Sequence, residues 1–385
     1  MRRPSLSRPS LGRPSVGRGE LIQIVLFVVA ALGVLFLPRF ISDFRAQQYA
    51  YVGIYLIALL GLNILTGFTG QISLGHGAFM AIGGYTTAIL ISDQGLKLGS
   101  HTFSGDMTDY WTIPLAGLLA GVVGFLFGFP ALRLTGLYLA LATFAVAVAT
   151  PALIRKFEDF TGGGAGINLF EAPGLTGVGG TDPITFEEIP GGVEIWRFTI
   201  PTFNEWLYYL SWGVALVMFV VAWALLRGRV GLAFRAIRDS ELAAASSGVN
   251  LARYKTLAFG ISAFYAGVAG ALLAIATTFV NPETFPITLS IFLLVGVVVG
   301  GLGSLWPLVF GAIFIQFLPL WAQTLNDPLP DSILWFDVPN FRAPGAPAVV
   351  YGVALILVMV LLPGGAAGLI RRITAYSRRL AQRAS

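Results

Sequence analysis

The chain has 385 residues, 56% of them hydrophobic and only 11% charged, whereas a soluble domain carries about 25% charged residues. Apolar runs of about 20 residues recur along it, which indicates a polytopic membrane protein. The absence of cysteine excludes disulfides, thiolate metal sites and cysteine nucleophiles. Two histidines, His76 and His101, are too few and too far apart to suggest a metal site. Without a P-loop or a nucleophile elbow, the chain is not expected to be an enzyme.

The first 20 residues form a low-complexity tail in which Arg-Pro-Ser recurs every five residues. Proline at this density opposes helix formation, so we expect a disordered, basic cytosolic tail. Its arginines favour a role in setting membrane orientation over attraction to anionic lipid. The apolar run at 21–37 lacks a small-residue cleavage site and ends in Pro38-Arg39. It therefore predicts a retained first span, not a signal peptide.

Nine further apolar runs predict membrane spans, which makes ten within a transmembrane domain at 21–363. They lie at 49–66, 71–92, 112–128, 134–154, 206–226, 255–281, 287–303, 305–323 and 347–363. The predicted fold class is thus all-α, a polytopic bundle of about ten transmembrane helices. Spans two to five and seven to ten would form two groups of opposite orientation, which suits an inverted repeat.

Charge predicts the orientation of these spans. With the N-terminus inside, the inner segments carry a net charge of +14 and the outer loops −9, which together give the chain's +5. Because lysine and arginine gather in cytoplasmic segments, we expect both termini in the cytosol, with a second basic tail at 364–385. Apart from Lys255, the boundary residue shared by the inner loop and the span 255–281, no acidic or basic residue falls inside a predicted span, so carboxylates for proton or sodium coupling are not expected there. The energy for uphill transport would come from elsewhere, unless the chain is a passive channel.

Two loops are longer than ordinary connectors. The predicted outer loop, 155–205, is acidic, opens with a glycine-rich stretch at 161–166 and alternates in a strand-like way at 193–200, which predicts a hairpin. The predicted inner loop, 227–255, is basic. It favours two short helices, at 231–237 and 241–247, with a cap at Asp239 or Ser240 and an end at Gly248. Such a pair favours a docking element for a partner over an amphipathic hairpin lying on lipid headgroups.

The stretch 63–91 is apolar enough for a bilayer, yet it holds six glycines and a row of neutral polar side chains. Ser73, Gly77 and Ala81 fall four apart, which predicts a helix face that another helix can approach closely. The polar side chains predict either interhelical hydrogen bonds or a path for a small polar solute. Neutral groups suit transit of a zwitterion, because fixed charges would trap one end of it. The candidate pathway residues are Asn63, Thr66, Gln71, Ser73, His76 and, further along the same span, Tyr85.

Three stretches resemble one known family. They are G-L-N-I-L-T-G-F-T-G-Q-I-S-L-G-H-G-A-F-M-A-I-G-G-Y at 61–85, P-A-L-R-L-T-G-L-Y-L-A-L-A-T-F-A at 130–145 with the Thr-Gly-Gly loop downstream, and the inner loop with the next span at 231–272. They resemble the membrane subunits of the high-affinity branched-chain amino-acid ABC importers, the LivM type. The resemblance covers most of 49–323 and omits the acidic loop after Ile167. Ala165 stands where relatives often carry a polar residue.

The resemblance implies an importer permease subunit in a bacterial or archaeal plasma membrane. Its implied partners are two cytosolic ATP-binding subunits, a second homologous permease and an extracytoplasmic solute-binding protein, with the lipid bilayer around it and no nucleic acid. The chain would bind no cofactor, because ATP is used by the partner subunits. The inner loop would be the segment that couples to an ATP-binding subunit. The residues implied in that coupling are Arg235, Arg238, Asp239, Glu241, Ala244 and Gly248. The small side chains at 243–247 predict an exposed helix face that fits a cleft in the ATP-binding subunit, with Arg235 and Arg238 in reach of acidic groups at the rim of that cleft.

Two classes of function stay open at this point. One is the permease of an ATP-driven importer for branched-chain or other neutral amino acids. The other is an autonomous channel or carrier for a small polar solute, which would not require the helical inner loop. Within the first class the substrate is also open, since urea and short-chain amide permeases have the same build.

Overall fold

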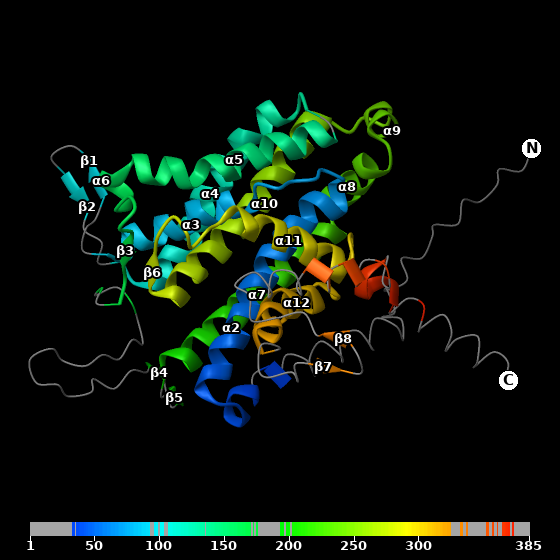
Figure 1. Ribbon diagram of the computed structural model, residues 1–385. Coiled ribbons are helices and arrows are strands. Elements are labelled where there is room, and N and C mark those ends of the chain that lie inside the picture. Colours follow the sequence, from blue (N-terminus) through cyan, green and yellow to red (C-terminus); the bar gives the residue numbers. More distant parts are fainter. Residues whose placement is uncertain are drawn as a thin grey trace, which may run out of the picture. The chain divides into compact units, whose positions relative to one another are not determined.

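The computed structural model describes most of the chain from residue 33 to residue 337 and scattered positions near the C-terminus (Figure 1). The described residues are 33–34, 36–92, 96–98, 101–103, 107–134, 136–170, 172, 175, 193–195, 198–200, 202–324, 332–333, 336–337, 352–353, 356–357, 360, 364–369 and 372. Contacts divide the chain into two units, Met1–Ser42 and Asp43–Ser385. In the first unit the structure gives the short 3₁₀ helix η1, Leu37–Phe40, with Pro38 in its first turn.

The second unit is built almost entirely from helices. Its helices are α2 (Asp43–Asn63), the π-helical turn η2 (Ile64–Phe68), α3 (His76–Ile91), α4 (Asp109–Ala131), α5 (Leu137–Lys156), α6 (Glu158–Thr161), α7 (Phe203–Arg227), α8 (Arg229–Asp239), α9 (Glu241–Ser246), α10 (Leu251–Thr277), α11 (Ile287–Gly300) and α12 (Leu308–Thr324). Five of them, counting α2 with η2, are long and apolar enough to cross a membrane, and α3, α11 and most of α12 are shorter apolar helices. The all-α, polytopic fold is confirmed. The predicted spans 21–37 and 347–363 lie largely outside the described residues.

Strands occur only as short antiparallel pairs in the part of the chain that the structure describes. The pairs are β1 (Leu96–Leu98) with β2 (His101–Phe103), β3 (Ile167–Asn168) with β6 (Phe279–Val280), β4 (Val193–Ile195) with β5 (Phe198–Ile200), and β7 (Ser332–Ile333) with β8 (Phe336–Asp337). The hairpin predicted at 193–200 is thereby confirmed. The β3–β6 pair joins the glycine-rich stretch after α6 to the end of α10.

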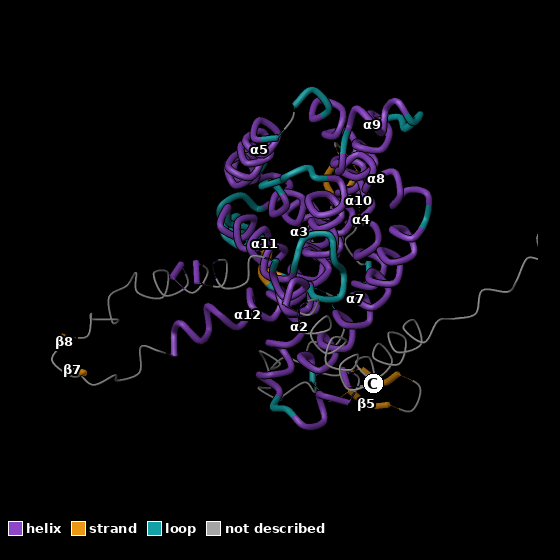
Figure 2. Tube along the Cα trace, turned by 90° about the vertical axis from the view of Figure 1, so that its right-hand side faces the viewer, coloured by secondary structure: helices purple, strands orange, loops and turns teal. Residues whose placement is uncertain are grey.

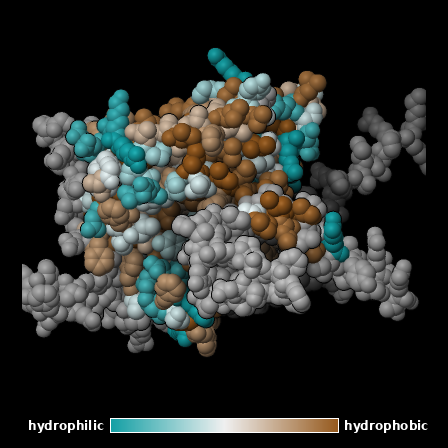
Figure 3. Space-filling model, in the orientation of Figure 1, coloured by the Kyte–Doolittle hydropathy of each residue, from teal (hydrophilic) through white to brown (hydrophobic). Residues whose placement is uncertain are grey.

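Helix α10 is the centre of the bundle and packs along α4, α3 and α2 (Figures 1 and 2). Small residues make this packing close: a Cβ atom added at Gly83 would lie 2.1 Å from the carbonyl oxygen of Gly267. The most apolar windows of α2 and α10 are 89% and 83% buried, against 28–39% in α4, α5 and α7. The latter three helices thus present apolar side chains at the surface, as lipid contact requires, and Figure 3 shows a broad apolar area on the face on which α5 lies.

Helices α8 and α9 lie at one end of the bundle, whereas β1, β2, α6, β3 and β6 lie at the opposite end (Figure 1). This separation agrees with the predicted placement of 227–255 and 155–205 on opposite sides of the membrane. The helices also extend beyond the predicted spans, so charged groups enter their ends. Asp109 is fully buried in the first turn of α4, and Lys255 is mostly buried in the second turn of α10.

The predicted continuous helix from residue 71 is wrong. Residues 70–75 are not helical, and α3 begins only at His76, so Ser73 does not share a helix face with Gly77 and Ala81. Gly70 takes a left-handed backbone conformation with φ 73°, which suits the end of the preceding helix. We call this non-helical segment, 70–75, the first break.

Candidate translocation and coupling sites

The first candidate site surrounds the first break, which links η2 to α3 by an extended stretch of chain (Figure 1). All six predicted pathway residues, which are Asn63, Thr66, Gln71, Ser73, His76 and Tyr85, are buried. Within the break itself, Ile72 is 43% exposed. Irregular backbone at membrane depth is tolerated only where protein covers it or a wet cavity lies beside it. The first break therefore needs hydrogen-bond partners from its surroundings.

Local bonds close the helix before the break. The hydroxyl of Thr66 donates to the carbonyl of Gln71 at 3.2 Å, and the Thr69 hydroxyl donates to the carbonyl of Leu65. The backbone N–H of Gln71 also donates to the Leu65 carbonyl, at 3.2 Å. These bonds and the π-helical turn replace the regular ladder at the point where α2 ends.

Side chains from other helices hold the break and the start of α3. Thr143 of α5 accepts a hydrogen bond from the N–H of Leu74 at 2.9 Å, and Ser290 of α11 accepts one from the N–H of Gly77 at 2.9 Å. His76 makes a hydrogen bond to the backbone of Ala58 in α2. Side chains of α5 and α11 thus satisfy backbone N–H groups in the break and in the first turn of α3, and His76 ties the start of α3 to α2.

The six predicted pathway residues divide into two groups by their hydrogen bonds. Asn63, Thr66 and Ser73 bond within the chain; the Ser73 Oγ accepts from the N–H of Gly75 at 3.3 Å. By contrast, Gln71 Nε2, His76 Nε2 and the Tyr85 hydroxyl are buried without a hydrogen-bond partner among the described residues. Buried polar atoms normally have a partner, so these three call for a solute or water.

Sequence reasoning missed two further buried hydroxyls without a hydrogen-bond partner among the described residues, those of Thr87 and Ser262. Both lie in helices that carry other hydroxyl side chains, such as Thr86 in α3 and Thr256 in α10, which bond back to their own helix. The sequence therefore gives no signal that separates Thr87 and Ser262 from ordinary helix hydroxyls.

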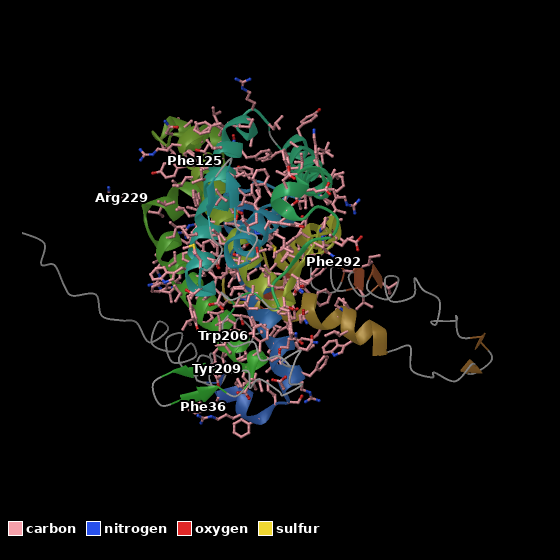
Figure 4. All side chains as sticks on the ribbon, turned by 90° about the vertical axis from the view of Figure 1, so that its left-hand side faces the viewer. Phe36, Phe125, Trp206, Tyr209, Arg229 and Phe292 are labelled. Atoms are coloured by element: carbon pink, nitrogen blue, oxygen red, sulfur yellow. The ribbon has the colours of Figure 1, made fainter. Side chains whose placement is uncertain are left out.

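Sequence reasoning also missed a cleft between α2, α10 and α11, at the end of the bundle opposite α8 and α9 (Figure 1). The cleft has a volume of about 490 Å³ and is lined by Tyr51, Tyr55, Leu273, Thr277, Asn281, Glu283, Thr284, Pro286, Thr288, Leu289 and Phe292. Phe292 is labelled in Figure 4. The lining mixes hydroxyls, one amide, one carboxylate and apolar side chains, which suits a small amphiphilic solute. The sequence predicted only a short outer loop at 282–286.

The second candidate site is the pair α8 and α9, which confirms the two predicted short helices. Ser240 caps α9, with its Oγ accepting from the N–H of Ala243 at 3.3 Å. Gly248 follows with φ 85°, a conformation that favours glycine. Glu241 forms an ion pair with Lys255 of α10 at 2.7 Å.

The structure corrects the predicted docking face in three places. Ala244 was expected on the exposed face, but it is buried against the chain. Arg235 donates to the carbonyls of Gly231 and Leu226, and Arg238 donates to the carbonyl of Gly67, so both guanidinium groups are engaged within the chain. Helix α8 is amphipathic and buries the apolar side chains of Ala233, Phe234 and Ile237.

The exposed surface of α8 and α9 carries large apolar side chains, whereas small side chains were expected there. Leu242 is 83% exposed and Leu232 is 62% exposed, on α9 and α8. Exposed apolar side chains beside a basic segment are available to a partner. Asp239 is exposed at the end of α8. The positions of the six predicted coupling residues do not test their predicted roles in coupling.

A family model described as the permease component of branched-chain amino acid transport systems matches residues 46–363. Two curated relatives are high-affinity branched-chain amino acid transport system permease proteins LivM. The Escherichia coli (strain K12) protein is 36% identical over 307 residues, 77% of this chain and 68% of the relative. The Salmonella typhimurium (strain LT2) protein is 37% identical over 271 residues, 68% of this chain and 60% of the relative. No solved structure matches the chain. The chain belongs to the family of permease components of branched-chain amino acid transport systems.

Proposed function

We propose that this chain is the membrane-spanning permease subunit of an ATP-driven importer for branched-chain amino acids. The observation that carries the proposal is the family match over 46–363. The chain is a multi-pass membrane transport subunit and not an enzyme. ATP hydrolysis would belong to two cytosolic ATP-binding subunits, and the chain itself would bind no cofactor. A second homologous permease and an extracytoplasmic solute-binding protein would complete the importer, with both termini of this chain in the cytosol.

The cleft would be the outer entrance for the amino acid. Leu273, Leu289 and Phe292 offer an apolar surface to a branched side chain, and the Glu283 carboxylate offers a partner to the ammonium group. Hydroxyl and amide groups of the cleft would take the carboxylate end. Because these contacts are weak and only one of them is charged, the solute would be able to leave again.

Beyond the entrance, the buried polar atoms without partners would carry the solute through the bundle. Gln71, His76 and Tyr85 offer neutral groups on the first break and α3. A buried polar atom that lacks a partner costs free energy, which a passing solute would recover by bonding to it. Asn63, Thr66 and Ser73 would instead shape the path, because their bonds within the chain are already made.

Uptake by the reconstituted importer tests this function. The chain, the second permease and the ATP-binding subunits would be placed in proteoliposomes, and radiolabelled leucine, urea and acetamide would be added with the solute-binding protein. We expect ATP-dependent uptake of leucine. Uptake by this chain without ATP-binding subunits would favour the autonomous channel or carrier, and a preference for urea or acetamide would favour the amide permease.

The cleft has a separate test in the same assay. Replacing Glu283 with glutamine removes the one carboxylate of the lining and should raise the KM for leucine with little change in the maximal rate. Glu158→Gln, on the exposed helix α6 at the same end of the bundle, is the matched control. An unchanged KM in the Glu283 variant would remove this residue from the entrance.

The docking surface is tested at its exposed leucine. Leu242→Glu places a charge on a side chain that touches little of this chain, so insertion should be normal and co-purification of the ATP-binding subunits should fall. A bulky residue at Ala244 would instead disturb packing inside the chain, because this position is buried. Normal assembly of the Leu242 variant would place the docking surface elsewhere.

A further inference from the structure

Three parts of the chain that are far apart in sequence meet at the end of α2. The side chain of Asn63 donates to the carbonyl of Ser304 at 3.0 Å and accepts from the N–H of Gly303 at 2.9 Å. One turn later, the carbonyl of Gly67 accepts a hydrogen bond from the guanidinium group of Arg238. The junction therefore joins η2, the non-helical residues 301–307 after α11, and the coupling helix α8.

Two glycines bring the parts of this junction into close contact. A Cβ atom at Gly67 would lie 2.0 Å from the Asn63 Oδ1 and 2.6 Å from the Gly303 nitrogen. A Cβ atom at Gly303, which has φ 73°, would lie 2.6 Å from Nη1 of Arg238. No side chain fits at either position without displacing the other parts. Groups packed this closely move together and do not slide past one another.

The junction adjoins both candidate sites. Gly67 lies three residues before the first break. Within the break, the side-chain nitrogen Nε2 of Gln71 is buried without a partner among the described residues. Arg238 is the penultimate residue of α8, two residues before the Ser240 cap that starts α9. One charge-assisted hydrogen bond thus links the corner between α8 and α9 to the residues just before the first break. A displacement of that corner can reach the break through this bond.

We propose that Arg238 is a positioning residue for transport. It passes the displacement of the corner between α8 and α9 to the first break and, through Asn63, to residues 301–307. The proposal rests on the proposed function, since an ATP-binding subunit must move that corner. A side chain held in this way can favour one of two arrangements of a broken helix, which is what coupling between two sites requires.

The other arginines of α8 do not make this connection. Arg235 bonds to the carbonyls of Gly231 and Leu226, which belong to α8 itself and to the end of α7. Arg229, at the start of α8, is exposed and makes no hydrogen bond or ion pair among the described residues (Figure 4). Arg229 therefore matches Arg238 in charge and helix, and differs in lacking a link to the first break.

The absence of cysteine from the chain allows a direct test. Ile72 is partly exposed in the first break, so Ile72→Cys gives a single thiol that reports on the break. The variant would be assembled with its partner subunits in proteoliposomes and treated with N-ethylmaleimide, with and without ATP. Labelling of this chain would be measured after its separation from the partner subunits.

We expect ATP to change the labelling rate about tenfold, the scale of an ordinary coupling between sites. The same change should remain in Arg229→Gln and disappear in Arg238→Gln, with Arg238→Lys restoring part of it through a single donor. Equal ATP dependence in Arg238→Gln, or none in the starting variant, would overturn the proposal. So would a loss of co-purified ATP-binding subunits in Arg238→Gln, since Arg238 would then be a docking residue.

Transport per ATP hydrolysed gives a second readout. In Arg238→Gln, ATP hydrolysis should continue while the amount of leucine imported per ATP falls about tenfold. A proportional fall in both rates would mean that Arg238 only stabilises the complex and would overturn the proposal. The labelling result does not depend on the substrate, so a wrong substrate in the proposed function would leave it unchanged.

Discussion

The two halves of the bundle each contain a long helix, a non-helical segment and a short helix. In the first half, α2 and η2 lead through the first break to α3, which has 16 residues. In the second half, α10 leads through residues 278–286, the second break, to α11, which has 14 residues. This shared order agrees with the predicted inverted repeat, which remains a prediction.

The two breaks are held in different ways. The first break and the start of α3 are held by polar side chains from elsewhere in the chain, Thr143 on the N–H of Leu74 and Ser290 on the N–H of Gly77. The second forms its own turn, in which the N–H of Thr284 donates to Asn281 Oδ1 at 2.8 Å and the N–H of Asn281 donates to the Thr284 hydroxyl at 3.1 Å. Backbone pairing of β3 with β6 supports it further.

The ring of Phe285 anchors the second break in the bundle. This ring is buried, lies 6.4 Å from the ring of Tyr85 in α3, and comes within 2.4 Å of where a Cβ atom of Gly84 would stand. The first break is thus fixed by hydrogen bonds and the second by a local turn with an aromatic anchor. Substitutions that remove one kind of contact should separate the two.

The largest expected effect is that of Phe285→Ala. Removing a buried phenylalanine ring leaves a cavity and should lower the free energy of unfolding by about 4 kcal/mol. Unfolding of the purified chain in mixed micelles with increasing SDS measures the change. Phe285→Leu keeps most of the volume and should cost about 1 kcal/mol. Equal losses in the two variants would show that the ring is not the anchor of the second break.

Asn63→Ala should have the next largest effect, about 3 kcal/mol. The change leaves the N–H of Gly303 and the carbonyl of Ser304 without their partner at a buried site. Asn281→Ala is the matched control in the second break, where the turn is half exposed and water can replace the amide, so about 1 kcal/mol is expected. Equal losses in the SDS titration would contradict the distinction between this buried junction beside the first break and the half-exposed turn of the second break.

The difference between the breaks explains what the sequence could predict. Hydropathy predicted the long helices, because 18 or more apolar residues mark a span whatever its neighbours are. The outer loop predicted at 282–286, between the apolar runs 255–281 and 287–303, also lies within the second break. The first break has no such local mark. Its partners Thr143 and Ser290 lie 69 and 213 residues away from the groups that they bind, beyond the reach of a local pattern.

The same limit applies to the candidate sites. The polar residues of the first break were found because they interrupt an apolar run. Which of them are already bonded was not predictable, since the partners of Asn63 are 240 and 241 residues away. The docking face was predicted from the small side chains of α9, but burial depends on how α9 packs, which its own sequence does not encode.

A smaller effect is expected for Thr143→Val, which keeps the shape of the side chain and removes its hydroxyl. The N–H of Leu74 loses its acceptor at a buried site, so the free energy of unfolding should fall by about 1.5 kcal/mol. Thr277→Val removes a half-exposed hydroxyl that bonds only to its own helix, and a change within about 0.5 kcal/mol is expected. The order of the two losses in SDS decides whether a distant side chain holds the first break.

The smallest effect on stability, together with a clear loss of transport, is expected for Gln71→Ala. Its amide nitrogen is buried without a partner among the described residues, so its removal should change the free energy of unfolding by no more than about 1 kcal/mol. If that nitrogen bonds to the solute in transit, leucine uptake by the reconstituted importer should fall about tenfold, which corresponds to the loss of one hydrogen bond to a charged group.

Ser73→Ala is the control for Gln71→Ala, because the Ser73 Oγ already accepts from the N–H of Gly75. It should lose about 1 kcal/mol of stability and retain most of its uptake. Full uptake in the Gln71 variant at normal expression would show that the polar groups of the first break only tie helices together.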